Sequence, residues 1–313
     1  MIVDWGLRLV SQKHDWSLPH LGRILLDVST SLPRQFKIFR ILTLPAFAGI
    51  ALREPKFPFK YLNKDYLAQG LTVDERASCF IHHYRRLHTA LPYKFVHQAL
   101  HRDLNIITTR RGDSTYCVTL SLSRSDEIGQ DREGELALKL HVDGMRVFVL
   151  AFTIVPGWVV ASDADDVVLI SRLQGVKGSY HEIQQATKAF HDIAPPALLV
   201  AVLQGIAKAG GISEMAGVCA MSQPNYTPEL SGSFRNAYDD FFLDLGASRV
   251  SAKFFASSFP LEEKPLAAVK RGHKTRTKDK RTLKQQIADD VCRLILQGSW
   301  SASTARSGAQ SQV

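Results

Sequence analysis

The chain has 313 residues, of which 45% are hydrophobic and 22% are charged. These values are ordinary for a folded globular protein and exclude a disordered or fibrous chain. The net charge of +9 is concentrated in segment 264–284, which holds nine Lys or Arg and one acid, so the rest of the chain is nearly neutral. Four cysteines without a CxxC pair predict reduced thiols and a cytoplasmic protein.

The N-terminal region predicts neither export nor a membrane span. Charged residues interrupt the short apolar runs of 1–16, which is unlike a secretory signal. The most apolar stretch, 41–52, is too short to cross a bilayer and contains Pro45. We expect a packed element here, and a peripheral contact with the inner membrane is the alternative.

The first half of the chain predicts helices followed by antiparallel strands. Prolines break the short helical patterns of 1–70, which indicates an irregular or helical cap. Apolar residues at helical spacing predict two helices between 72 and 101, separated by Pro92. Asp143-Gly144 is the two-residue signal of a tight hairpin. Alternating segments predict strands at 116–123, 135–142 and 146–155.

The second half predicts alternating strands and helices. A continuous apolar run predicts a central strand at 166–171, followed by a glycine-bearing loop at 172–178. Helical patterns follow around 183–190, from Pro195-Pro196 to Gly210-Gly211, and along the stripe that contains Tyr238 and Phe242. Further strands are predicted at 216–221 and 249–257, and an amphipathic helix at 283–296.

These elements predict an α+β fold in which helices flank a mixed, largely antiparallel sheet. We expect a helical or irregular N-terminal cap and a C-terminal helix around one core. The predicted boundaries are a cap at 1–70, a core at 71–262, a basic segment with an amphipathic helix at 263–297, and a disordered tail at 298–313.

The strand, loop and helix at 166–190 form a candidate phosphate site. Backbone N–H groups at a helix N-terminus can hold a phosphate, and Arg172 and Lys177 would add positive charge. The alternative is an ordinary connection in which Gly175 and Gly178 only satisfy turns. The spacing matches neither a Walker loop nor a dinucleotide fingerprint.

Other catalytic patterns receive no support from the sequence. His82, His83 and His88 lack the spacing of metal ligands, so no metal is predicted. A GxSxG nucleophile motif does not occur. Tyr238 and the nearby aspartates either supply acid and base groups or form the core edge and the wet face of one helix.

Four blocks in one order resemble the VirK/YbjX family of bacterial proteins. They are SRLQGVKG at 171–178, the helix pair that ends in AKAGG, AYDDFFLDLGA at 237–247, and KPLAAVKRGHKTRTKDKRTL at 264–283. The resemblance covers roughly residues 80–296. It implies a setting in virulence and in resistance to antimicrobial peptides, without an assigned reaction.

The order of elements is also similar to the acyl-coenzyme A N-acyltransferase (GNAT) fold. The loop of that fold has the form R/Q-x-x-G-x-G/A, which Arg172 and Gly175 match while Gly178 comes one position late. Its catalytic tyrosine aligns with Phe242, which has no proton to give, and Tyr238 lies one helical turn earlier on the same face. A further departure is that two helices, instead of one, precede the next strand.

Two hypotheses of different classes follow from these resemblances. The first is an acyltransferase that modifies an envelope component or a protein amine, with Tyr238 as the acid. It would bind acyl-coenzyme A through Arg172, Gln174, Gly175, Lys177 and Gly178.

The second is a non-enzymatic regulatory or adaptor protein that binds anionic lipid, lipopolysaccharide or nucleic acid. Its contacts would come from the basic tail, unless that tail folds back on the protein's own acidic surface. The predicted polyanion-binding residues are Lys270, Arg271, Lys274, Arg276, Lys278, Lys280 and Arg281.

Overall fold

The fold is built around one eight-stranded sheet. The computed structural model describes residues 32–54, 56–123, 132–263, 265, 267, 269 and 271–298. The sheet order is β1-β2-β3-β4-β5-β6-β8-β7, and all neighbours are antiparallel except β5 and β6. The strands are Leu104–Arg111 (β1), Ser114–Leu122 (β2), Leu136–Val142 (β3), Met145–Pro156 (β4), Asp166–Gly175 (β5), Glu214–Val218 (β6), Ser248–Arg249 (β7) and Phe254–Ser258 (β8).

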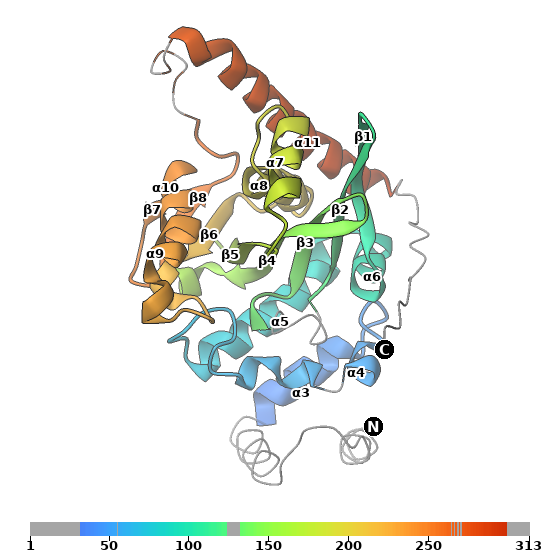
Figure 1. Ribbon diagram of the computed structural model, residues 1–313. Helices are drawn as coiled ribbons and strands as arrows, with labels where there is room; N and C mark the ends of the chain where they lie inside the picture. The colour runs from blue at the N-terminus through green and yellow to red at the C-terminus, as the bar shows by residue number, and fades with distance from the viewer. Residues whose placement is uncertain are drawn as a thin grey trace, which may run out of the picture.

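Helices lie on both sides of this sheet, which confirms the predicted α+β class (Figure 1). The elements that precede the sheet are Leu32–Leu42 (α3), Ile50–Arg53 (α4), Phe57–Leu62 (η1), Val73–Ala90 (α5) and Tyr93–His101 (α6). Later helices are Tyr180–Ala189 (α7), Pro195–Ala209 (α8), Ser231–Phe234 (α9), Arg235–Asp240 (η6, a π-helical turn), Phe241–Asp244 (α10) and Lys274–Gln297 (α11). Short 3₁₀ turns occupy Gly157–Val160 (η3), Ala220–Ser222 (η4), Pro228–Leu230 (η5) and Arg271–His273 (η8).

Local sequence signals account for several of these elements. The α5 helix begins with a capping box, because the Thr72 hydroxyl accepts from the Glu75 N–H and the Glu75 carboxylate accepts from the Thr72 N–H. The Asp143-Gly144 hairpin is confirmed. Both residues have positive φ, and Val142 pairs with Met145 across the turn.

The strand predictions were incomplete at three places. β1 was not predicted, and it pairs with β2 along its whole length at one edge of the sheet. β5 does not end at Ser171 but continues to Gly175, because residues 172–175 pair with β4. The predicted strand at 249–257 is two strands, β7 and β8, with β8 inserted between β6 and β7.

The two faces of the central strands differ in chemistry. One cross-strand row is Leu120, Leu138, Leu150 and Leu173, all buried in the hydrophobic core. The neighbouring row, on the opposite face, is Ser121, Ala137, Ala151 and Arg172. Directly opposed residues point to the same face, so Arg172 projects from the small and polar side of the sheet.

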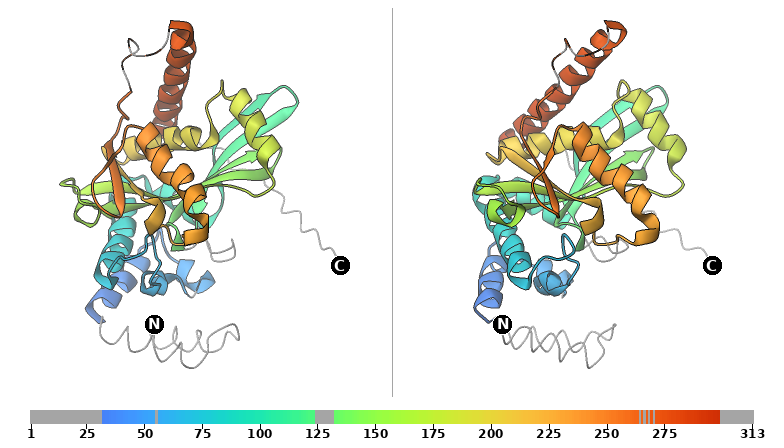
Figure 2. Two further views of the ribbon diagram at one scale, coloured as in Figure 1. Left: turned by 60° about the vertical axis from the view of Figure 1, so that its left-hand side comes forward. Right: turned by 90° about the vertical axis from the view of Figure 1, so that its left-hand side faces the viewer.

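The long helix α11 has one half in the core and one half outside it. Ile287, Ala288, Val291 and Ile295 are buried, and a Cβ at Gly205 of α8 would lie 2.7 Å from the Val291 Cβ, so the two helices are in close contact. The Lys274 end rises away from the body (Figure 2). No helix in the described ranges is long and apolar enough to span a membrane.

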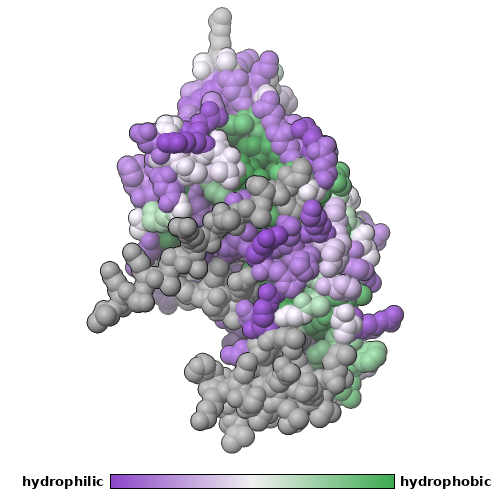
Figure 3. All heavy atoms as spheres, turned by 90° about the vertical axis from the view of Figure 1, so that its right-hand side faces the viewer, coloured by the Kyte–Doolittle hydropathy of each residue, from purple (hydrophilic) through white to green (hydrophobic). Residues whose placement is uncertain are grey.

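Most of the described surface seen in Figure 3 is hydrophilic. A recessed hydrophobic area lies in its upper half, and another lies near the level of α3. Leu32 and Phe36 of α3 are more than half exposed. Residues 1–31 and 299–313 are outside the described part of the chain. They include less than half of the predicted cap at 1–70 and nearly all of the predicted disordered tail at 298–313.

Candidate functional site

The parallel strands β5 and β6 separate soon after they pair. Their register contains three pairs, Val168 with Met215, Leu169 with Ala216, and Ile170 with Gly217. β6 ends one residue later, at Val218, whereas β5 continues to Gly175. Beyond Ile170, the edge of β5 that faces away from β4 therefore has no strand partner among the described residues. We call this opening the split.

A bulge in β5 determines which backbone groups face the split. Ile170 pairs with Phe152 and Arg172 with Ala151, so Ser171 is an extra residue. The Val176 N–H donates to the Val147 carbonyl at 2.9 Å, on the β4 side. Because antiparallel residues alternate in direction, the Leu173 and Gly175 N–H groups lie on the other edge, toward the split.

Tyr238 brings a hydroxyl to this edge. The Leu173 N–H donates to the Tyr238 hydroxyl oxygen at 3.4 Å. The tyrosine lies in the π-helical turn η6, a kind of helix irregularity that is frequent at functional sites. Burial raises the pKa of Tyr238 to about 12, so the phenol keeps its proton near neutral pH.

The helix that carries Tyr238 is fixed by packing and by one polar contact. Phe234 stacks on Tyr238 with ring centroids 5.7 Å apart. The Ala220 N–H donates to the Asp239 carboxylate at 2.7 Å, which ties the helix to the end of β6. Phe242 is fully buried, and a Cβ at Gly217 would overlap its ring, so Phe242 is a packing residue beneath the split.

A carboxylate, Glu133, and a guanidinium, Arg172, lie near enough to Tyr238 to affect its pKa in opposite directions. Arg172 forms an ion pair with Glu133, whose carboxylate also accepts from the Asn225 side-chain amide. Burial raises the pKa of Glu133, and the charge of Arg172 partly offsets this effect. Arg172, which was predicted to add positive charge to a phosphate site, pairs with Glu133 in the structure.

The short segment 132–134 places Glu133 there by crossing the polar face of the sheet. A Cβ at Gly134 would lie 3.0 Å from the Ala151 Cβ, so the chain passes directly over β4. Ser171 of β5 donates its hydroxyl to the Glu133 carbonyl, which fixes the segment to the sheet. Glycine is required at this crossing because the backbone approaches β4 too closely for a side chain.

The predicted phosphate loop is shorter than its sequence suggested. Gln174 and Gly175 belong to β5, and a Cβ at Gly175 would lie 3.0 Å from Ile183 of α7. Only residues 176–179 connect β5 to α7, with Lys177 exposed and Gly178 at positive φ. Gly175 is thus both the last residue of the β5 edge that faces the split and the residue from which the loop starts.

Five of the predicted polyanion-binding residues, Lys274, Arg276, Lys278, Lys280 and Arg281, lie in the first half of α11. Lys274 and Lys278 are exposed, whereas Arg276 pairs with Asp192 at 2.5 Å and Lys280 donates to the Asp192 carbonyl at 2.7 Å. Arg281 pairs with Glu263 at 2.7 Å. Three of these five cations therefore contact Asp192 or Glu263, while the other two are exposed. Lys270 and the side chain of Arg271 are outside the described residues.

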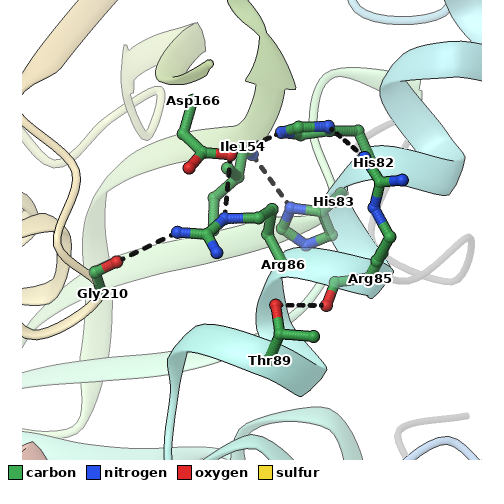
Figure 4. A network of polar contacts seen from close by, with 8 residues as sticks. All are labelled: His82, His83, Arg85, Arg86, Thr89, Ile154, Asp166 and Gly210. Atoms are coloured by element: carbon green, nitrogen blue, oxygen red, sulfur yellow. Dashed lines mark hydrogen bonds and ion pairs between the residues drawn. The ribbon is translucent and has the colours of Figure 1, made fainter. Parts of the chain in front are cut away.

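A second polar network lies at the other end of β5 (Figure 4). His82 Nε2 and Arg86 Nε of α5 contact the same Asp166 carboxylate oxygen at 2.7 and 2.8 Å. Arg86 also donates to the Gly210 carbonyl at 3.3 Å. Among the residues the structure describes, no group of three or more His, Cys, Asp or Glu side chains is placed to hold a metal ion. We assign this network to anchoring α5.

Sequence reasoning missed Glu133, Asn225 and the role of the Leu173 N–H. Glu133 and Asn225 are 92 residues apart in the chain, and neither belongs to a recognisable motif. The one local signal was the pair of glutamates around Gly134, where a glycine next to a predicted strand indicates a close backbone approach.

The fold and the split define an α+β protein whose polar site lies between two parallel strands. The chain belongs to the family described as protein of unknown function (DUF535), which matches residues 30–292. This is the VirK/YbjX family that the sequence blocks resemble. No curated protein matches the chain at a significant level.

Proposed function

We propose that the split is the active site of an acyl-coenzyme A dependent N-acyltransferase. The observation that carries the proposal is the contact between the Tyr238 hydroxyl and the Leu173 N–H where β5 leaves β6. The separation of β5 from β6 gives an acyl donor a strand edge to approach beside Gly175. The bulge at Ser171 and the π-helical turn under Tyr238 add support, since both are features that often accompany active sites.

The reaction joins an amine to the acyl group of a thioester. The amine nitrogen attacks the carbonyl carbon, a C–N bond forms, and the C–S bond breaks. Glu133 takes the amine proton, and its burial-raised pKa makes it a better base near neutral pH. Tyr238 gives its proton to the leaving thiolate and recovers one from Glu133, so protons balance over one turnover.

Donor binding in this proposal uses the strand edge and the start of α7. The Gly175 N–H faces the split, and the first N–H groups of α7 have no partners within the helix. Lys177 is exposed beside them and adds an attraction that salt screens. Gln174 and Gly178 complete the connection, while Arg172 is assigned to holding Glu133.

The test begins with calorimetry of the unmodified protein and acetyl- and palmitoyl-coenzyme A. Transfer is then measured as thiol release with a lysine peptide or an amino sugar as acceptor. Tyr238→Phe removes only the hydroxyl, so donor binding should persist while the rate falls by about 100-fold or more.

Tyr226→Phe is the matched control, because Tyr226 belongs to the same aromatic row through Phe234. It should leave the rate unchanged. If no acyl-coenzyme A binds at millimolar concentration, the acyltransferase proposal is wrong, and the regulatory class remains.

A second candidate function rests on the charge of the first half of α11. Between Lys274 and Lys284 there are six Lys or Arg and one acid, and the body supplies the carboxylates of Asp192 and Glu263. Six cations minus three acids leave an excess of three. We propose that this excess binds anionic lipid, lipopolysaccharide or nucleic acid, which would make the protein peripheral at the inner membrane or a regulator. A role in virulence or antimicrobial-peptide resistance fits either candidate.

A further inference from the structure

A groove runs between α8, α11 and the segment that follows β8. Its main cavity has a volume of about 400 Å³, within the usual range for small-molecule sites. An adjoining cavity of about 290 Å³ shares Gln204, Pro260 and Gln285 with it and extends toward Lys208. Figure 2 shows α11 standing over α8 while the chain after β8 climbs beside it. The groove is distinct from the split and shares none of its polar residues.

The floor of the groove is apolar. Its lining includes Ala197, Val200 and Ala201 of α8, together with Leu245, Pro260 and Leu261. Small residues on α8 leave room beneath α11, and the neighbouring cavity adds Ile212 and Phe259. An occupant that covers this floor must therefore present hydrocarbon to it.

One side of α11 is apolar where the helix packs on α8 and cationic in the turns that precede this contact. Positions 280, 284, 287, 291 and 295 follow helical spacing and share one side of the helix. The last three are buried, whereas the first two are lysines that point toward the body. Lys284 from this side, together with Arg281, forms the rim above the apolar floor.

Among the described residues that line the groove, Glu263 supplies the carboxylate at this rim. Glu263 contacts Arg281 Nε at 2.7 Å through one oxygen and Lys284 Nζ at 2.5 Å through the other. Two cations thus converge on one anionic group, with a net charge of +1. Glu263 is partly exposed and belongs to a surface segment, so the cost of replacing it by another anion is small.

We propose that this groove binds a single-chain anionic amphiphile. Its phosphate or carboxylate head lies between Arg281 and Lys284 in place of the Glu263 side chain, and its hydrocarbon chain lies along the α8 floor. The proposal needs both features at once, because an apolar floor alone or a cation pair alone does not select an amphiphile. It does not depend on acyl transfer at the split.

The experiment is calorimetric titration of the full chain with dodecyl phosphate below its micelle concentration. Dodecanoate, dodecyltrimethylammonium and inorganic phosphate serve as comparators. We expect dodecyl phosphate or dodecanoate to bind at least tenfold more tightly than inorganic phosphate, and the cationic amphiphile not to bind. The tighter of the two anions indicates whether the natural source is a phosphorylated lipid or a free fatty acid.

Three variants separate this site from a structural ion pair. Glu263→Gln removes the competing carboxylate and should tighten binding roughly two- to fivefold. Lys284→Gln should weaken it by a similar factor, and Ala197→Phe, which fills the floor, should weaken it further. Arg293→Gln is the matched control, because Arg293 lies on α11 in an exposed pair with Asp290.

Thermal melts first establish that each variant is folded. The proposal is overturned if neither anion binds the unmodified protein, or if dodecyltrimethylammonium binds as well as the anions. It is also overturned if Glu263→Gln weakens binding while remaining folded, since Glu263 would then support the site instead of competing for it.

Discussion

Two regions on the same face of the sheet use the same chemical groups in different surroundings. Glu135 is completely buried and accepts from the hydroxyls of Tyr66, at 2.8 Å, and Tyr84. Lys60 lies 3.1 Å from the same carboxylate. These partners come from the cap and from α5, so this closed cluster joins the N-terminal elements to the sheet.

The second region is the split, whose carboxylate, Glu133, lies two residues before Glu135 in the chain. Glu133 also has a cation, Arg172, and a nearby tyrosine, Tyr238. Here the tyrosine meets a backbone N–H at a strand edge. A buried carboxylate with a cation and a tyrosine is therefore not enough to mark a candidate active site. What distinguishes the split is an edge of β5 that no strand in the described ranges covers.

The largest effect is expected from Glu135→Gln in the closed cluster. The change leaves the Lys60 charge buried without its carboxylate, and breaking a buried pair in this way costs about 3–5 kcal/mol. Chemical denaturation measures the loss. Glu133→Gln should cost clearly less, because Arg172 remains partly exposed. Equal losses would show that both clusters are structural.

Removing the hydroxyl of Tyr84 or of Tyr238 compares the closed cluster with the split through a smaller loss of stability. Tyr84→Phe removes a hydrogen bond to a buried carboxylate, so the free energy of unfolding should fall by about 1.5–3 kcal/mol. Tyr238→Phe removes a longer bond to a neutral amide and should cost at most about 1 kcal/mol.

Only Tyr238→Phe should reduce acyl transfer. A loss of stability at Tyr238 as large as the loss at Tyr84 would make Tyr238 a structural residue and weaken the proposed chemistry.

The pH dependence of stability should come in part from His83, beside the closed cluster. The Ile154 N–H donates to His83 Nδ1 at 2.9 Å, and burial holds the pKa of His83 well below 6.5. The unfolded chain therefore binds a proton that the folded chain does not. Stability from this group is complete above pH 6.5 and is lost as the pH falls below it, with a slope that approaches about 1.4 kcal/mol per pH unit.

His83→Asn keeps an acceptor for the Ile154 N–H but removes the titration. Urea melts between pH 5 and 7 should show a shallower slope for this variant, while the exposed His97→Asn should behave like the unmodified protein. An unchanged slope in His83→Asn would assign the acid sensitivity to another group.

Local patterns predicted the elements whose ends are determined by neighbouring residues. The Thr72 capping box, the Asp143-Gly144 turn and the prolines at the start of α8 act within a few residues, so the sequence alone was sufficient. The π-helical turn left the predicted stripe of Tyr238 and Phe242 intact, since both remain buried.

Long-range pairing determined what the sequence did not predict. The residues RLQG at 172–175 are compatible with a loop, and only pairing with β4 makes them strand. β1 has polar residues along an edge, where one side of the strand needs no apolar pattern. The position of Glu133 depends on Gly134 crossing β4, a contact with Ala151 and Phe152, which lie beyond β3 in the chain.

The smallest effect is expected from Lys177→Gln, which tests how much positive charge contributes to acyl-coenzyme A binding beside the split. Lys177 is exposed beside the start of α7, so Lys177→Gln should leave the melting temperature unchanged. If the donor phosphates lie there, the variant should weaken acyl-coenzyme A binding by a few-fold at low salt, and the difference should disappear at about 1 M salt, where the screening length is only ~3 Å. Lys188→Gln, at the opposite end of α7 and also exposed, should have no effect at either salt concentration. A loss common to both lysines would indicate a general electrostatic attraction to the protein. A loss at Lys177 that persists in high salt would mean that the lysine makes a desolvated contact, which would move the phosphates from the strand edge into the loop.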